Sequence, residues 1–146
     1  MVVPLPVIME LDSQAKVNTT PLGQAAAAAL TYITAHIRSH SASLKVQTSR
    51  GNYLTNLNVR LEEVDFSSST WERSMDDLIL RAALWQDEHW IDRSAMLKGG
   101  DSIKDTAGAA KVVLLSFDRM LRLKARSRQL NAASEQELAS ILAPAS

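Results

Sequence analysis

Acidic side chains beside apolar segments are the residues of this sequence best suited to do chemistry. Asp76 and Asp77 begin an apolar segment with helical spacing, and Asp118 follows a run of aliphatic residues. Glu10 follows the valines near the amino end. Mg²⁺ and Mn²⁺ prefer such oxygen ligands, and they can activate water and neutralise charge on a transferring phosphoryl group. The acids therefore favour metal-assisted hydrolysis of a phosphodiester.

Water is the expected nucleophile of such a reaction. The sequence has no cysteine, and no serine triad is evident in it. Ser116 lies two residues before Asp118. We expect its hydroxyl to support the site by a hydrogen bond to a ligand carboxylate or to water.

Each acid also has a purely structural explanation. Acids in a first helical turn are favoured by the helix dipole, which would account for either Asp76 or Asp77 alone. An aspartate after a strand is often a turn former or a helix N-cap, which would account for Asp118. Glu10 alone fits a solvated helix residue. The explanations stay open for each residue taken by itself.

Basic residues gather around Asp118. They are Lys111, Arg119, Arg122, Lys124, Arg126 and Arg128. Arg122 and Arg126 share a helix face by their spacing, so with Arg119 and Lys124 they are expected to hold a nucleic-acid backbone near the acids. The alternative is an ordinary solvated helix face.

Histidines and tryptophans offer weaker candidates. His36 and His40 have the i, i+4 spacing of a metal-binding pair, but no third ligand is evident, which favours a surface pair. Trp71, Trp85 and Trp90 flank an apolar helical segment, where packing is the commoner role and stacking on bases the alternative.

Composition sets the class of protein. The 146 residues with 46% hydrophobic content fit one domain with a sizeable core. The 16 basic and 16 acidic residues cancel, so a nucleic-acid site must come from local segregation of charge. The absence of cysteine makes a reducing compartment the default but does not set a location. The location that we expect is intracellular, nuclear or cytoplasmic. The apolar start lacks a basic region and acquires Glu10 and Asp12 early, so neither a signal peptide nor a membrane anchor is expected.

Strands and helices alternate in the predicted structure. The first half predicts a strand ending before Pro4, a helix with Val7, Ile8 and Leu11, and a second helix from Pro21 to about Arg38 with Thr20 as its N-cap. A half-exposed strand over residues 44–47 and a turn over 49–52 follow. The chain then continues to Thr70 in a loop-rich connection, which includes a short strand among Leu54, Leu57, Val59 and Leu61.

The second half predicts a helix over residues 75–88, a surface insertion over 89–110, and a strand over 112–115 that is buried on both faces. A helix after Asp118 and a short segment over 130–133 follow. The last helix begins with the capping box Ser134-x-x-Glu137. This alternation predicts an α/β domain of three layers, with a mainly parallel central sheet between helices. Ligands bind beyond the carboxyl ends of such strands, where Asp118 lies.

Three motifs in order carry a resemblance to a known family. The run VVLLSFDRMLRLKA (residues 112–125) resembles the PIN-domain pattern of a buried strand, Ser/Thr-x-Asp, and a helix beginning with Leu-Arg-x-Lys-Ala. MDDLIL (residues 75–80) is similar to the family's Asp-x-x-Ile helix start, and VVPLPVIMELD (residues 2–12) is similar to its second strand and helix. The closest resemblance is to the eukaryotic branch that includes the endonuclease of nonsense-mediated mRNA decay.

The resemblance implies a Mg²⁺- or Mn²⁺-dependent endoribonuclease acting on single-stranded RNA, with RNA-decay proteins as possible partners. It implies that Glu10, Asp76 and Asp118 are metal-site acids, with Asp77 adjacent and Ser116 supporting. One departure is the family's first strand, which commonly ends in Asp-Thr-Asn and has no counterpart before Met1. We therefore expect a PIN-like domain truncated at its amino end. The alternative is a catalytically inactive PIN-like module that binds RNA or a decay-factor protein.

Overall fold

The computed structural model describes residues 1–58, 74–89 and 112–142. The chain divides into two compact units, Met1–Ala82 and Ala83–Ser146. Apart from His89, the predicted insertion lies outside the described residues, as do Val59, Leu61, Trp71 and Trp90. Among the described helices, none is both long enough and apolar enough to cross a membrane.

The first unit begins with a strand that leads directly into a helix. Strand β1 (Val2–Pro4) is followed by α1 (Leu5–Ala15). Pro6 lies in the first turn of α1, where a backbone N–H has no helical acceptor and a proline therefore costs nothing. Strand β2 (Lys45–Gln47) pairs with β1 in parallel, with Val2 opposite Lys45 and Pro4 opposite Gln47.

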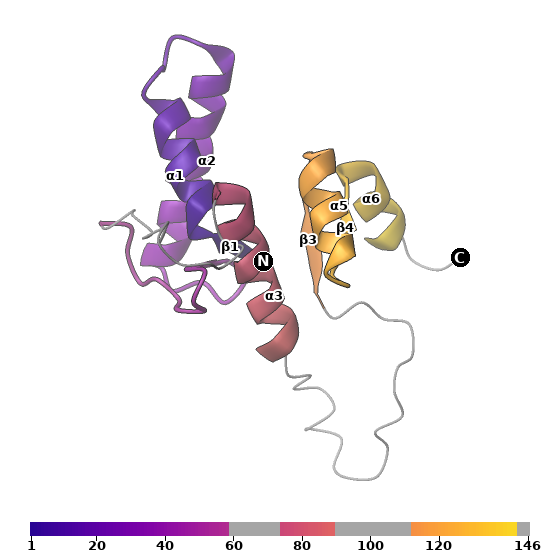
Figure 1. The fold of residues 1–146 in the computed structure, drawn as a ribbon. Coiled ribbons are helices and arrows are strands. Elements are labelled where there is room, and N and C mark those ends of the chain that lie inside the picture. The colour runs from indigo at the N-terminus through magenta and orange to yellow at the C-terminus, as the bar shows by residue number, and fades with distance from the viewer. Residues whose placement is uncertain (59–73, 90–111, 143–146) are drawn as a thin grey trace. The chain divides into compact units, whose positions relative to one another are not determined.

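Helix α2 (Pro21–Arg38) lies beside α1 (Figure 1). As predicted, Thr20 is its N-cap, and its Oγ1 accepts a hydrogen bond of 3.0 Å from the Gly23 amide. The start of α2 approaches the end of α1 so closely that a Cβ on Gly23 would lie 1.9 Å from the Val17 carbonyl oxygen. This position therefore requires glycine.

The core of the first unit lies between the two helices and the β1–β2 pair. Its buried members are Leu5, Ile8, Ile33, Ile37, Leu44, Val46 and Leu57. β2 is more buried than the predicted half-exposed strand, because Val46 and Gln47 are both 0% exposed. Leu54 and Leu57 lie outside any strand.

Helix α3 (Met75–His89) forms where its apolar spacing predicted it. Leu78, Leu80 and Ala82 in its first half are buried. The buried Gln47 side chain donates a hydrogen bond of 3.2 Å from Nε2 to the carbonyl oxygen of Ala82. This bond ties the carboxyl end of β2 to α3 within the first unit.

The second unit repeats the parallel strand pair. Strand β3 (Val113–Leu115) pairs with β4 (Asn131–Ala133), and α5 (Arg119–Ser127) connects them, followed by α6 (Glu135–Leu142). The predicted capping box opens α6: the Ser134 amide donates to Glu137 Oε2 (2.8 Å), and the Glu137 amide donates to Ser134 Oγ (3.4 Å). The hydrogen bond from the Ser134 backbone, helped by the Arg126 charge, lowers the pKa of Glu137.

The α/β class is confirmed, and both strand pairs are parallel as predicted. The arrangement of three layers around one central sheet stays a prediction. β3 differs from the expected strand buried on both faces, since Leu114 is 8% exposed and Leu115 is 50% exposed. Successive strand residues face opposite sides, and within the described residues the Leu114 side is buried whereas Leu115 on the other side is exposed.

Candidate active site

Asp118 lies between the carboxyl end of β3 and the first turn of α5. It is the N-cap of α5, and its Oδ1 accepts hydrogen bonds from the amides of Met120 (2.8 Å) and Leu121 (3.1 Å). Within the described parts of the chain, Oδ2 accepts no hydrogen bond. The capping explanation of Asp118 is therefore correct, and the cap leaves one oxygen of an exposed carboxylate available to a ligand.

Ser116 supports the backbone of Asp118 rather than its carboxylate. Its Oγ accepts a hydrogen bond from the Asp118 amide (3.1 Å), whereas the expected bond was to a ligand carboxylate or water. The Ser116 amide in turn donates to the Ala133 carbonyl oxygen at the end of β4 (3.1 Å). The turn that carries Asp118 is thereby joined to the strand pair.

Two arginines of α5 hold this turn and the neighbouring strand. Arg122 Nη1 donates to the Ser116 carbonyl oxygen at 2.7 Å. Arg126 Nη2 donates to the Ala132 carbonyl oxygen at 3.0 Å and lies 3.5 Å from Glu137 Oε2. A charge-assisted bond to a carbonyl is stronger than a neutral one, so these side chains fix α5 against both strands.

The predicted RNA-binding residues therefore differ in what they contact. Arg122 and Arg126 have partners in the protein, and Lys124 also has one. Arg119 is exposed and forms no hydrogen bond or ion pair among the residues that the structure describes. It is the member of the predicted set whose charge is available next to Asp118.

Asp76 and Asp77 lie in the first turn of α3, as predicted, but they are not equivalent. Asp77 Oδ2 accepts a hydrogen bond of 3.0 Å from Ser74 Oγ, which in turn accepts one of 3.3 Å from the Asp77 amide. Asp77 therefore takes part in the helix cap. The half-buried Asp76 carboxylate has no partner within the described residues, so of the two acids it is the one whose oxygens are available to a ligand.

Glu10 is an exposed residue in the second turn of α1. It lies six residues beyond the end of β1, or about 9 Å along the helix axis. Glu10 has a partner within the chain. Its part in a metal site stays a prediction.

The structure joins some of these residues and leaves the others in separate units. Ser116, Asp118 and Arg122 form one hydrogen-bonded group in the second unit. Asp76 and Glu10 belong to the first unit. Over residues 1–58, 74–89 and 112–142, no three His, Cys, Asp or Glu side chains form a group able to hold a metal. The chemistry of the donors fits a hard divalent ion, because the Asp76 carboxylate and Asp118 Oδ2 are oxygen donors that have no partner among the residues described.

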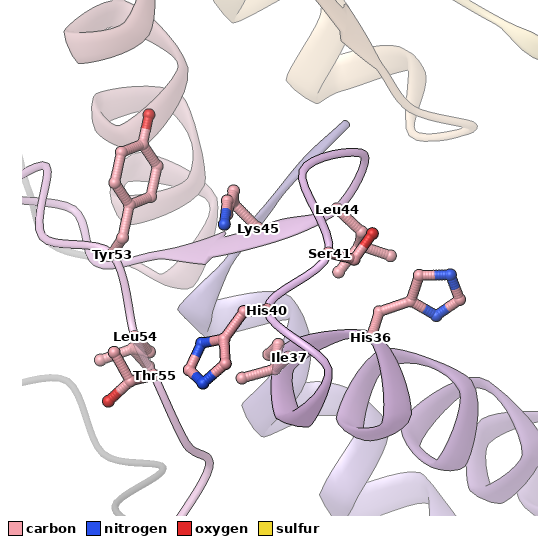
Figure 2. Close-up of a pocket in the computed structure, with 9 residues that line it drawn as sticks. All are labelled: His36, Ile37, His40, Ser41, Leu44, Lys45, Tyr53, Leu54 and Thr55. Atoms are coloured by element: carbon pink, nitrogen blue, oxygen red, sulfur yellow. The ribbon is translucent and has the colours of Figure 1, made fainter.

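A cavity in the first unit was not anticipated from the sequence. It has a volume of about 100 Å³ and lies between the end of α2, the start of β2 and the segment after the turn (Figure 2). Nine residues line it: His36, Ile37, His40, Ser41, Leu44, Lys45, Tyr53, Leu54 and Thr55. The two imidazoles point in different directions, because α2 ends at Arg38 and His40 has a φ of 52° (Figure 2). They do not form a metal-binding pair.

The sequence contained a signal for the Ser74–Asp77 cap and another for the part of the chain that holds the cavity. Ser74 stands three residues before Asp77, the spacing of a capping box, as Ser134 stands before Glu137. From residue 13 to residue 61 the chain has no acidic residue but five basic ones: Lys16, Arg38, Lys45, Arg50 and Arg60. That imbalance marks the part of the chain that contains the cavity.

Comparison with known proteins identifies the family. A family model described as PIN domain matches residues 1–136, which is nearly the whole chain, so the protein belongs to the PIN-domain family. No curated protein matches the sequence. PIN domains are generally nucleases that depend on divalent metal ions, so the chain carries a nuclease fold.

Proposed function

We propose that this PIN-domain protein is a metal-dependent endoribonuclease that cleaves single-stranded RNA by attack of water on a phosphodiester. The observation that carries the proposal is the setting of Asp118. Its backbone is fixed by Ser116, its Oδ1 caps α5, and its Oδ2 is left for a ligand at the carboxyl end of a parallel strand. That is where ligands bind in sheets of this type.

In the proposed site, Glu10, Asp76 and Asp118 hold Mg²⁺ or Mn²⁺, with Asp77 adjacent. When bound, such an ion lowers the pKa of its water ligand and neutralises negative charge on the phosphoryl oxygens. Asp118 is kept in place for this role by the bonds that Ser116 and Arg122 make around its turn. Arg119, whose charge has no described partner, contacts the RNA backbone beside it.

The cellular role we propose is RNA processing or quality control, in the nucleus or the cytoplasm, with RNA-decay proteins as partners. This proposal rests on the resemblance of the three ordered motifs, at residues 2–12, 75–80 and 112–125, to the branch of the family that includes the endonuclease of nonsense-mediated mRNA decay. The proposal for the chemistry does not depend on this assignment.

The test is cleavage of an unstructured, end-labelled RNA by the full chain in Mg²⁺, in Mn²⁺ and in EDTA. We expect cleavage only with metal, and a loss of about 100-fold or more in Asp118→Asn, since even residues that merely support a metal ligand cost 10- to 100-fold. Asp87→Asn is the matched control, because Asp87 is an exposed acid in the last turns of α3, outside the proposed site. Equal rates for Asp118→Asn and Asp87→Asn would refute the proposal. RNA binding without cleavage in either metal would instead support an inactive PIN-like module.

A further inference from the structure

The cavity at the end of α2 has the chemistry of an anion site. Of the described residues that line it, His40 and Lys45 carry an imidazole and an ammonium group, Ser41, Tyr53 and Thr55 carry hydroxyl groups, and none carries a carboxylate (Figure 2). The His36 ring bonds instead to the Tyr32 carbonyl oxygen (2.9 Å) and packs on the Tyr32 ring. Ile37 and Leu54 supply apolar wall. We propose that this cavity binds a phosphate group of single-stranded RNA, as a subsite separate from the metal-site acids. The choice of RNA rests on the proposed function.

The cavity lies in a part of the chain that is rich in basic residues. Residues 13–61 contain five basic side chains and no acid, although Lys16 lies 3.9 Å from the Asp12 carboxylate and so adds little to the positive charge of this part. The Lys45 ammonium forms no hydrogen bond or ion pair within the described residues. A phosphate at this position therefore meets a cation that no carboxylate of the described residues neutralises.

His40 has an unusual backbone conformation for a side chain with a Cβ. With φ of 52°, it occupies the position after α2 at which glycine is the usual residue. The Ser41 amide bonds to the His36 carbonyl (3.0 Å), and the His40 amide bonds to the Ile37 carbonyl (3.1 Å). These bonds leave the backbone amides unable to bind an anion, so recognition falls to side chains. A residue with a side chain at this positive φ costs free energy relative to glycine, which supports a role for the His40 ring.

The cavity lies at the opposite end of β2 from the expected catalytic edge. Lys45 is the first residue of β2 and pairs with Val2, whereas Gln47 is the last and pairs with Pro4. The metal ion and the phosphate that is cut are expected beyond the carboxyl ends of the strands. The subsite therefore holds a different nucleotide from the one that is cut.

The test is binding of a labelled oligouridylate to the full chain in EDTA, where no cleavage occurs. Each phosphate contact adds about 0.7 to the slope of log K against log salt for a single strand, which corresponds to about fourfold in affinity at ~0.15 M salt. We expect Lys45→Gln to lose about fourfold and to reduce the slope by about 0.7. Arg50→Gln is the matched control, because Arg50 is an exposed cation five residues further along the chain that does not line the cavity.

A second variant separates binding from folding. His40→Gly places the preferred residue at the positive φ, so its thermal unfolding midpoint should be equal to or higher than that of the parent chain. Its affinity for the oligonucleotide should nevertheless fall severalfold. Oligonucleotides with a 5′-hydroxyl and with a 5′-phosphate distinguish the source of the phosphate: equal binding indicates an internal phosphodiester, and binding that requires the 5′-phosphate indicates a terminal monoester.

The proposal is overturned if Lys45→Gln and His40→Gly bind like the parent, if Arg50→Gln loses as much affinity as Lys45→Gln, or if the parent does not bind in EDTA. Its failure is distinguishable from failure of the nuclease proposal. Cleavage that depends on Asp118 with binding unaffected at Lys45 removes only the subsite. Binding that depends on Lys45 without metal-dependent cleavage removes only the nuclease.

Discussion

The two roles assigned to Asp118, helix cap and metal ligand, make different demands on substitutions at this one position. Asn retains a capping oxygen but loses the charge, Ser retains a smaller cap, and Ala loses both. The cap of Asp118 consists of two hydrogen bonds, of 2.8 and 3.1 Å. Losing an N-cap to alanine costs about 1 kcal/mol, and losing the negative charge at an exposed helix start costs about 0.5 kcal/mol.

These values order the variants by stability. Asp118→Asn and Asp118→Ser should each lose about 0.5 kcal/mol, and Asp118→Ala about 1.5 kcal/mol. At about 4 °C per kcal/mol, the unfolding midpoint should fall by about 2 °C for the first two and by about 6 °C for the third. Thermal unfolding followed by circular dichroism measures this order.

Metal-dependent cleavage should follow a different order. All three substitutions remove the carboxylate, so all three should lose about 100-fold or more in rate, whatever their stability. Rates are compared well below the lowest unfolding midpoint. If Asn and Ser retained activity while Ala lost it, the rate would follow the cap, and Asp118 would be a structural residue only.

Three further predictions concern other contacts of the two units. Gly23→Ala should destabilise the chain by about 2 kcal/mol in urea unfolding, because the clash with the Val17 carbonyl outweighs the gain in helix propensity; a stabilised variant would contradict the close approach. Arg122→Ala should lower the cleavage rate about 10-fold and Arg122→Lys should restore part of it, since a lysine can still donate to the Ser116 carbonyl; equal rates for both would remove its positioning role. Folding lowers the pKa of Glu137 from 4.5, so the ionised carboxylate stabilises the fold at pH values above 4.5. The difference in free energy of unfolding between the parent and Glu137→Gln should therefore shrink as the pH falls below 4.5.

Local sequence rules predicted the ends of the elements well. Thr20 and the Ser134–Glu137 pair cap their helices as expected, because an N-cap needs only a side chain within three residues of the amides it satisfies. The start of α3 was placed correctly by its apolar helical spacing. The acids Asp76 and Asp118 therefore occupy the predicted local positions, at a helix start and after a strand.

Contacts between distant residues account for what the sequence did not predict. Gln47 is polar and alternates with apolar neighbours, which suggested exposure, yet it is buried because its side chain bonds to the Ala82 carbonyl, 35 residues away. The spacing of Arg122 and Arg126 predicted a shared face correctly but not its contacts. Carbonyl oxygens of Ser116 and Ala132 accept their bonds, and these positions depend on the pairing of β3 with β4.

The bonds of Arg122 and Arg126 also bear on how the second unit opens. Arg122 joins α5 to the turn that carries Asp118, Arg126 joins it to β4, and the Ser116 amide closes the connection to Ala133. Native proteins open in cooperative pieces, and elements linked by several bonds open together. Asp118 therefore loses its geometry only when the whole strand–helix–strand piece unfolds, so fraying at the end of α6 leaves it in place. The backbone amides of this piece would then show a common free energy of opening in hydrogen-exchange measurements.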